Sequence, residues 1–219
     1  MGVLRHAKEV QLISESVLFE RLRRIVKNEL AGSRYKVQGR RSFVRKLDDV
    51  EAVIQIDGSK QGGGPYHIMW GIVVPVLVPP LWKVRYSAGQ PGLGCMFGGP
   101  INLSALPDSY RVFVGDELSD QDGAAIIAAQ VGASMERMKD VASVDGLLEE
   151  IVQSDSDSYF FPFENWKNTV AKALQILQNP DLAKGYSENQ EWLNMSPRAQ
   201  RVIDETVAIA TSRAAGDPQ

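Results

Sequence analysis

The sequence predicts an α+β fold: a small antiparallel sheet of three or four strands, an N-terminal helix and a helical C-terminal half. Three observations support this prediction. Apolar residues recur at helical spacing before residue 32, two segments between residues 50 and 74 alternate in polarity, and helical stripes follow residue 123. With 219 residues, 44% of them hydrophobic, the chain can bury one core. We therefore expect a single domain over 1–219, with the helix and sheet in 14–114 and the helical portion in 115–213.

The first helix is expected to begin near Ser14 or Ser16, which are good N-caps, and to end by Gly32, which suits a C-terminal cap. Its apolar stripe consists of Val17, Leu18, Leu22, Ile25, Val26 and Leu30. Basic residues occupy other positions. This pattern is typical of an amphipathic helix packed on a core.

Three strands are expected to follow as a meander. Residues 41–47 are β-prone, and Asp48-Asp49 makes a turn. Residues 50–57 alternate, with Val53 as the one exception, so we expect one buried and one wet face. The glycine-rich segment 57–65 allows the chain to reverse before the alternation resumes over 66–74.

The rest of the chain is expected to be a long glycine- and proline-rich loop over 79–107, a short fourth strand over 111–114, and helices. The helices are predicted over 124–131, 144–152 and 162–177. Ser196-Pro197 predicts the start of another helix, with Ser196 as the N-cap. The residues predicted to be core are Leu22, Ile54, Ile56, Trp70, Ile72, Trp166, Leu174 and Val202.

The composition argues against several classes of protein, namely secreted, membrane-spanning and disulfide-bonded ones. Arg5, Lys8 and Glu9 interrupt the N-terminal segment, so we expect no secretory signal peptide. The charge-free segment 61–82 is broken by glycine and proline and is too short in its apolar part for a membrane span. A single cysteine, Cys95, excludes an intramolecular disulfide and favours a cytoplasmic location.

Charge is distributed unevenly along the chain. Residues 1–46 hold 12 Lys/Arg and 4 Asp/Glu, a balance of +8, whereas residues 47–219 hold 12 and 23, a balance of −11. The basic segment has two interpretations. It is either a solvated face whose charge is neutralised by acidic helices packed beside it, or an exposed patch. An exposed patch would bind phosphates by charge while Tyr35 and Phe43 stack on bases. The residues that would bind nucleic acid are Arg21, Arg24, Arg40, Arg41 and Arg45.

Catalytic and metal motifs are weak. Cys95 lies in a glycine-rich segment, and as a nucleophile it would need His67 as its base. We expect His67 to lie too far away to share a proton with it. Asp116, Glu117, Asp120 and Asp122 suggest calcium, but an EF-hand register would put Leu118 and Ala129 at ligand positions. These acids are better interpreted as the polar segment before a helix at 124, and no cofactor or metal is expected.

Residues 19–22, 35–45, 53–56 and 66–72, taken in order, resemble a family of uncharacterised bacterial domains. The match covers roughly residues 17–75. The chain has Asp-Gly-Ser-Lys at 57–60 where that family more often shows glutamine-lysine-serine. The resemblance implies an α+β fold with a small antiparallel sheet and implies no activity.

The absence of a catalytic constellation favours a non-enzymatic protein-binding module, with a toxin-neutralising immunity protein or an accessory subunit as candidate roles. The partner would then be another protein, because acidic side chains attract basic partners. No membrane partner is expected. The expected contact residues are Trp82, Asp116, Glu117, Asp120 and Asp122. The alternative is a nucleic-acid-binding protein that uses the basic N-terminal helix and first strand.

Overall fold

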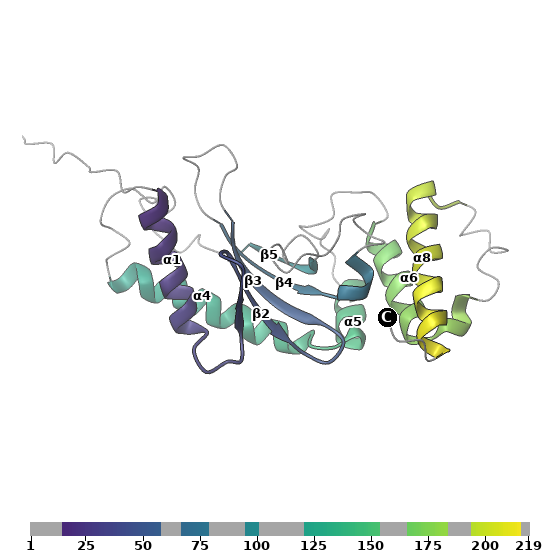
Figure 1. The fold of residues 1–219 in the computed structure, drawn as a ribbon, viewed down its shortest axis with the longest axis horizontal. Coiled ribbons are helices and arrows are strands. Elements are labelled where there is room, and N and C mark those ends of the chain that lie inside the picture. The colour runs from purple at the N-terminus through teal and green to yellow at the C-terminus, as the bar shows by residue number, and fades with distance from the viewer. Residues whose placement is uncertain are drawn as a thin grey trace, which may run out of the picture.

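The computed structural model describes residues 15–57, 67–78, 95–100, 121–153, 166–183 and 194–215. The elements run in the order α1 (Glu15–Glu29), β1 (Lys36–Gln38), β2 (Ser42–Lys46), β3 (Glu51–Asp57), β4 (His67–Val73), η1 (Pro75–Leu77), β5 (Cys95–Pro100), α4 (Gln121–Asp140), α5 (Val144–Gln153), α6 (Trp166–Gln178), η4 (Pro180–Ala183) and α8 (Pro197–Ala214). Figure 1 shows helices gathered around one sheet. The α+β class is confirmed.

The sheet is antiparallel throughout and its strands follow chain order, β1-β2-β3-β4-β5. It has two strands that the polarity pattern did not reveal. β1 is three residues long, and β5 lies inside the segment 79–107 that was expected to be a loop. That expectation was wrong for residues 95–100, which pair with β4. The strand expected over 111–114 lies outside the described residues.

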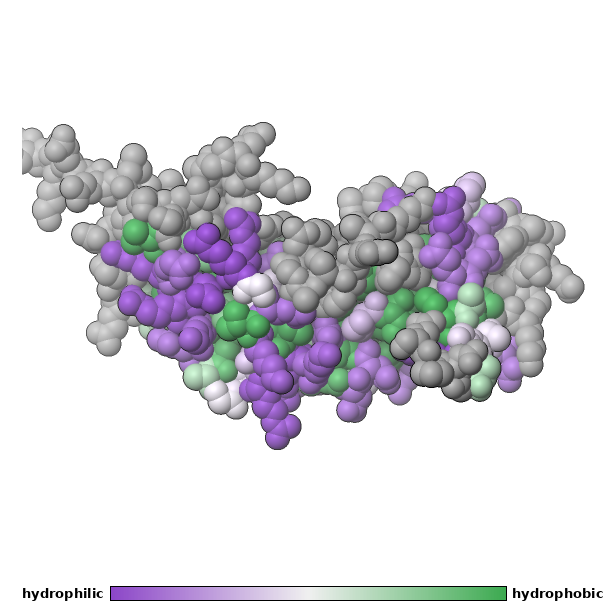
Figure 2. Space-filling view, viewed as in Figure 1, coloured by the Kyte–Doolittle hydropathy of each residue, from purple (hydrophilic) through white to green (hydrophobic). Residues whose placement is uncertain are grey.

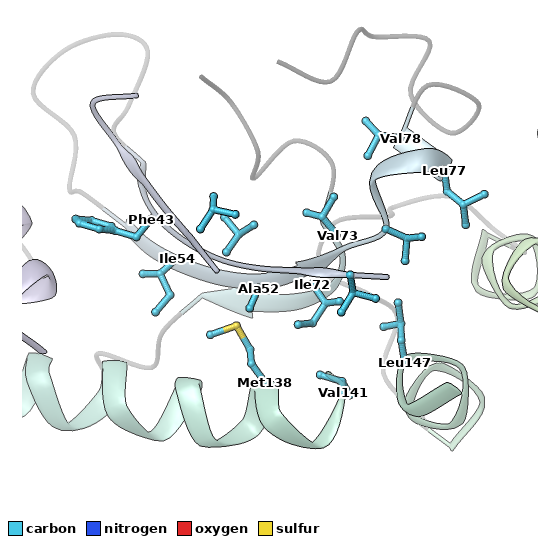
Figure 3. Close-up of a cluster of buried hydrophobic side chains, with 14 of the residues drawn as sticks. Phe43, Ala52, Ile54, Ile72, Val73, Leu77, Val78, Met138, Val141 and Leu147 are labelled. Atoms are coloured by element: carbon cyan, nitrogen blue, oxygen red, sulfur yellow. The ribbon is translucent and has the colours of Figure 1, made fainter. Parts of the chain in front are cut away.

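β3 lies at the centre of the sheet and both of its faces are buried. Figure 3 shows Ala52 and Ile54 pointing toward Met138 on α4, while Val73 points to the opposite side. Val53 and Glu51, on that opposite face, are also buried. The expectation of one wet face was therefore wrong.

The cross-strand register groups apolar residues on this second face. Val53 pairs with Val44 on one side and with Gly71 on the other. Val44 is buried as well. A second apolar layer thus continues across three strands, and the single exception in the alternating pattern, Val53, marked it.

The helices divide into two groups. α4 runs along the sheet face that carries Ile54, and α1 packs on α4 and on β3. α6 and α8 pack on each other, and α5 packs on α6, beyond the opposite end of the sheet (Figure 1). Among the described helices of the C-terminal half, α4 therefore covers one sheet face, whereas α6 and α8 lie beyond the end of the sheet.

Local signals account for several helix and turn boundaries. The Ser196 hydroxyl accepts a hydrogen bond from the Ala199 amide at 3.3 Å, so the N-cap of α8 is confirmed. The Asp48-Asp49 turn is closed by a bond from the Leu47 amide to the Val50 carbonyl. α4 is longer than the predicted 124–131, because apolar positions continue to Met138.

The predicted core is mostly confirmed. Trp70 is partly buried and packs edge-on against Phe97, with ring centroids 5.7 Å apart. The side chain of Trp166 lies outside the described residues. The other predicted core residues are all buried, namely Leu22, Ile54, Ile56, Ile72, Leu174 and Val202.

Gly98 allows β5 to approach β4 closely. Its φ of +140° is one that residues with a Cβ rarely adopt, and an added Cβ would overlap the Trp70 carbonyl oxygen and lie 2.5 Å from Gly71 Cα. Both atoms belong to backbone, so the contact can be relieved only by moving a strand. Glycine is thus required at this position for β5 to pair.

We predict that Gly98→Ala lowers the free energy of unfolding by about 2 to 3 kcal/mol, as overpacking and backbone strain do elsewhere. Denaturant unfolding followed by circular dichroism measures it. Gly132→Ala is the matched control, because an added Cβ there meets only the carboxylate end of Glu29, at 3.2 Å, within a helix. That variant should gain about 0.5 to 1 kcal/mol from helix propensity. Equal effects of the two substitutions would contradict the close approach at Gly98.

Candidate functional site

The basic part of the chain folds into α1 and the β1–β2 hairpin. Residues 15–46 carry ten Lys/Arg and three Asp/Glu, a net charge of +7. Figure 2 shows hydrophilic side chains gathered at the end of the molecule where α1 lies. The question for function is whether these charges form one surface or several separate ones.

Phe19 joins the two basic segments. Its side chain is 3% exposed and lies in the core beside Leu22 and Val26, although the sequence pattern did not assign it to the apolar stripe. Val17, which that pattern did assign to the stripe, is 44% exposed. The guanidinium carbon of Arg40, on the β1–β2 loop, lies 4.9 Å from the centroid of its ring, and that of Arg41 lies 6.0 Å away. Both distances are within the range of cation–π attraction, which places the loop against the helix.

Glu20 lies at the centre of the charges on this side of α1. Arg23, Arg24 and Lys27 follow it by three, four and seven residues, a spacing that places all of them on one helix face. We call the five cations Arg23, Arg24, Lys27, Arg40 and Arg41 the basic surface. Against its one central carboxylate it carries a net charge of +4.

Glu20 makes two long ion pairs. Its carboxylate lies 3.5 Å from an Arg23 nitrogen and 3.4 Å from an Arg40 nitrogen. The Glu20 and Arg40 side chains are 52% and 67% exposed, whereas the Arg23 side chain is 30% exposed. The exposed pair with Arg40 contributes little to stability, so an incoming anion can replace the carboxylate as the partner of Arg40 at small cost.

Two of the predicted nucleic-acid-binding arginines lie away from the centre of this surface. Arg21 is partly buried and lies at its margin, three residues before Arg24. Arg45 is four residues beyond Arg41 along β2, which is about 13 Å. The charge of Arg45 instead lowers the pKa of Tyr35, against the larger effect of burial. The structure therefore brings together Arg24, Arg40 and Arg41, and separates Arg45 from them.

Glu20, Arg23, Lys27 and Phe19 were not among the predicted site residues. The helical spacing from Glu20 to Lys27 could have revealed the first three. Nothing in the sequence indicates that Arg40 folds back onto Phe19, because the two residues are 21 positions apart and joined through a turn.

The expected aromatic stacking on bases is not supported. Phe43 is 2% exposed and lies in the core. Tyr35 is partly buried, and its hydroxyl donates to the Met138 sulfur on α4 at 3.8 Å. Both rings contribute to packing between the sheet and the helices, so neither is presented to a ligand.

The strand register argues against Cys95 and His67 as a nucleophile and its base. The Cys95 backbone lies opposite Val73, at the other end of β4 from His67. Six residues of strand correspond to about 20 Å, which is too far for proton transfer between two side chains. The expected separation is confirmed for the backbone positions.

Most of the expected acidic contact residues cannot be placed. Trp82, Asp116, Glu117 and Asp120 lie outside the described residues. Asp122 lies in the first turn of α4, which begins at Gln121 rather than at 124. Within the described ranges, no cluster of three His, Cys, Asp or Glu residues is arranged to hold a metal ion.

Tyr35 has a shifted acidity. Burial raises its pKa to about 12, and the Arg45 charge acts in the opposite direction. In the unfolded chain the same group titrates near pH 10. Between those two values the unfolded state loses the proton while the folded state keeps it, so the free energy of unfolding falls as pH rises.

We predict that stability falls by up to about 2 kcal/mol between pH 10 and 12 because of this one group. Denaturant midpoints at intervals across this window measure the fall. Tyr35→Phe keeps the ring in place and removes the titration, so the variant should lose less stability over the same window. Parallel pH profiles of the two proteins would contradict the burial of the Tyr35 hydroxyl.

None of the described helices combines the length and the hydropathy that a membrane span requires. Comparisons with protein-family models, with curated proteins and with solved structures gave no match. The resemblance over residues 17–75 therefore stays a prediction, and function has to be argued from the surface itself.

Proposed function

We propose that this chain is a non-enzymatic binding protein that holds nucleic acid on the basic surface. The observation that carries the proposal is the contact of Arg40 with Phe19 and Glu20. This contact turns two basic segments into one surface with five cations around one carboxylate. The net charge of the whole chain is −3, but a polyanion responds to the local field of the patch that faces it.

The chemistry of the surface favours phosphates as ligands. Arg40 and Arg41 present guanidinium groups, which pair with phosphate oxygens in a fixed geometry. α1 adds Arg24 and Lys27, which are exposed. Each phosphate neutralised by such a cation releases a counterion, so the binding constant falls steeply with added salt.

We predict that Arg40→Gln/Arg41→Gln weakens DNA binding and lowers the slope of log K against log salt by about 1 to 2, because up to two phosphate contacts are lost. Fluorescence anisotropy across a salt series measures both quantities. Arg201→Gln/Arg213→Gln on α8 removes the same charge from two exposed positions in the other helix group and should leave the slope unchanged.

Glu20→Gln supplies the opposite change. It frees Arg23 and Arg40 from an exposed carboxylate, so affinity should rise roughly two- to fivefold, the value of a surface ion pair. Thermal unfolding of each variant checks that the fold is kept. Absent binding at low salt, or the same slope in every variant, would contradict the proposal.

Protein binding through the acidic residues is a second proposal, and the excess charge of −11 over residues 47–219 favours it. In this role the chain would neutralise a basic toxin or serve as an accessory subunit in the cytoplasm. Trp82 and the acids at 116, 117, 120 and 122 would make the contacts.

Its test is capture by the tagged chain from its host cell, beside a variant in which Asp116, Glu117, Asp120 and Asp122 are replaced by amides. We expect a stoichiometric basic protein with the original chain and its loss with the variant. Recovery of no such partner from cells grown under several conditions would contradict this second proposal.

A further inference from the structure

We infer that the basic surface binds double-helical nucleic acid through its phosphates and prefers it to a single strand. The inference rests on the proposed function and specifies its substrate class. It follows from three features of the surface: the burial of the aromatic rings that the structure describes there, the restricted position of Arg40 and Arg41, and the density of its charge.

The first feature is that the described rings of this region are turned inward. Phe19 and Phe43 are 3% and 2% exposed. Tyr35 directs its hydroxyl to Met138. Proteins that bind single strands depend on aromatic platforms on which successive bases stack, each worth about 1 to 3 kcal/mol. Within the part of the chain that the structure describes, the basic surface offers charge without such a platform.

The second feature is that two of the cations are restricted in position before any ligand arrives. Arg40 and Arg41 lie over the buried Phe19 ring. Cations restricted in this way suit a stiff ligand, because neither partner then loses much conformational freedom on binding. A duplex is stiff over its whole contact length, whereas a flexible strand must be ordered first.

The third feature is charge density. From Glu20 to Lys27 the helix rises by about 10 Å. Over that length a duplex carries about six phosphates and one strand carries about three. The cations beside this helical stretch therefore meet a higher density of opposite charge on a duplex than on a single strand.

The test compares three probes of equal length at one low salt concentration: a DNA duplex, one of its strands, and an RNA duplex of the same sequence. Fluorescence anisotropy measures each dissociation constant. We expect at least one of the duplexes to bind about tenfold or more tightly than the single strand, given the larger counterion release. Comparison of the two duplex dissociation constants shows whether the surface binds the DNA or the RNA duplex more tightly.

If the single strand binds as tightly as the better-bound of the two duplexes, this inference fails while the proposed function stands. If no probe binds, the proposed function itself fails. Arg40→Gln/Arg41→Gln should reduce the duplex preference and Arg201→Gln/Arg213→Gln should keep it. A preference that survives the first pair of substitutions would overturn the assignment to this surface.

Discussion

The burial of the apolar stripe of α1 is the contact on which the basic surface depends. Phe19, Leu22 and Val26 are each at most 3% exposed, and they fix the helix against α4 and β3. Burying side chains of this size stabilises the fold by about 1.5 to 3 kcal/mol each. The same burial fixes which side of the helix faces solvent, and so it determines where Arg23, Arg24 and Lys27 lie.

Phe19 has two roles in this arrangement. One part of the ring belongs to the core, and guanidinium groups from the β1–β2 loop approach it from outside. A cation above a ring at a surface contributes roughly 0.5 to 1 kcal/mol. That is small for the stability of the fold, but it is enough to keep a short loop beside the helix rather than away from it. Packing and charge are thus coupled at a single residue.

Sequence patterns revealed those elements whose signals are local. Ile54 and Ile56 alternate clearly, and Ser196-Pro197 combines a cap with a favoured first residue, so strand β3 and the start of α8 were predictable. β1 was not, because three residues with one apolar side chain show no period. β5 was missed for a related reason: Gly98 and its neighbours suggest a loop, and only pairing with β4 makes them a strand.

The surface was predictable in part. Charge counts indicated a basic N-terminal region, and Arg24, Arg40 and Arg41 were among its expected residues. The distance between Arg41 and Arg45 depends on the direction in which β2 runs away from the loop. The burial of Tyr35 and Phe43 depends on where α4 and α1 pack. Such contacts join residues far apart in the chain, as Tyr35 and Met138 are. A single sequence carries no local signal for them.

The central claim is that α1 and the β1–β2 loop act as one surface, and a nuclear magnetic resonance titration with a short DNA duplex tests it most directly. The amide resonances of residues 20–27 and 39–42 are expected to shift together along one saturation curve, while those of α6 and α8 stay in place. Shifts confined to one of the two segments, or centred on α6 and α8, would contradict it.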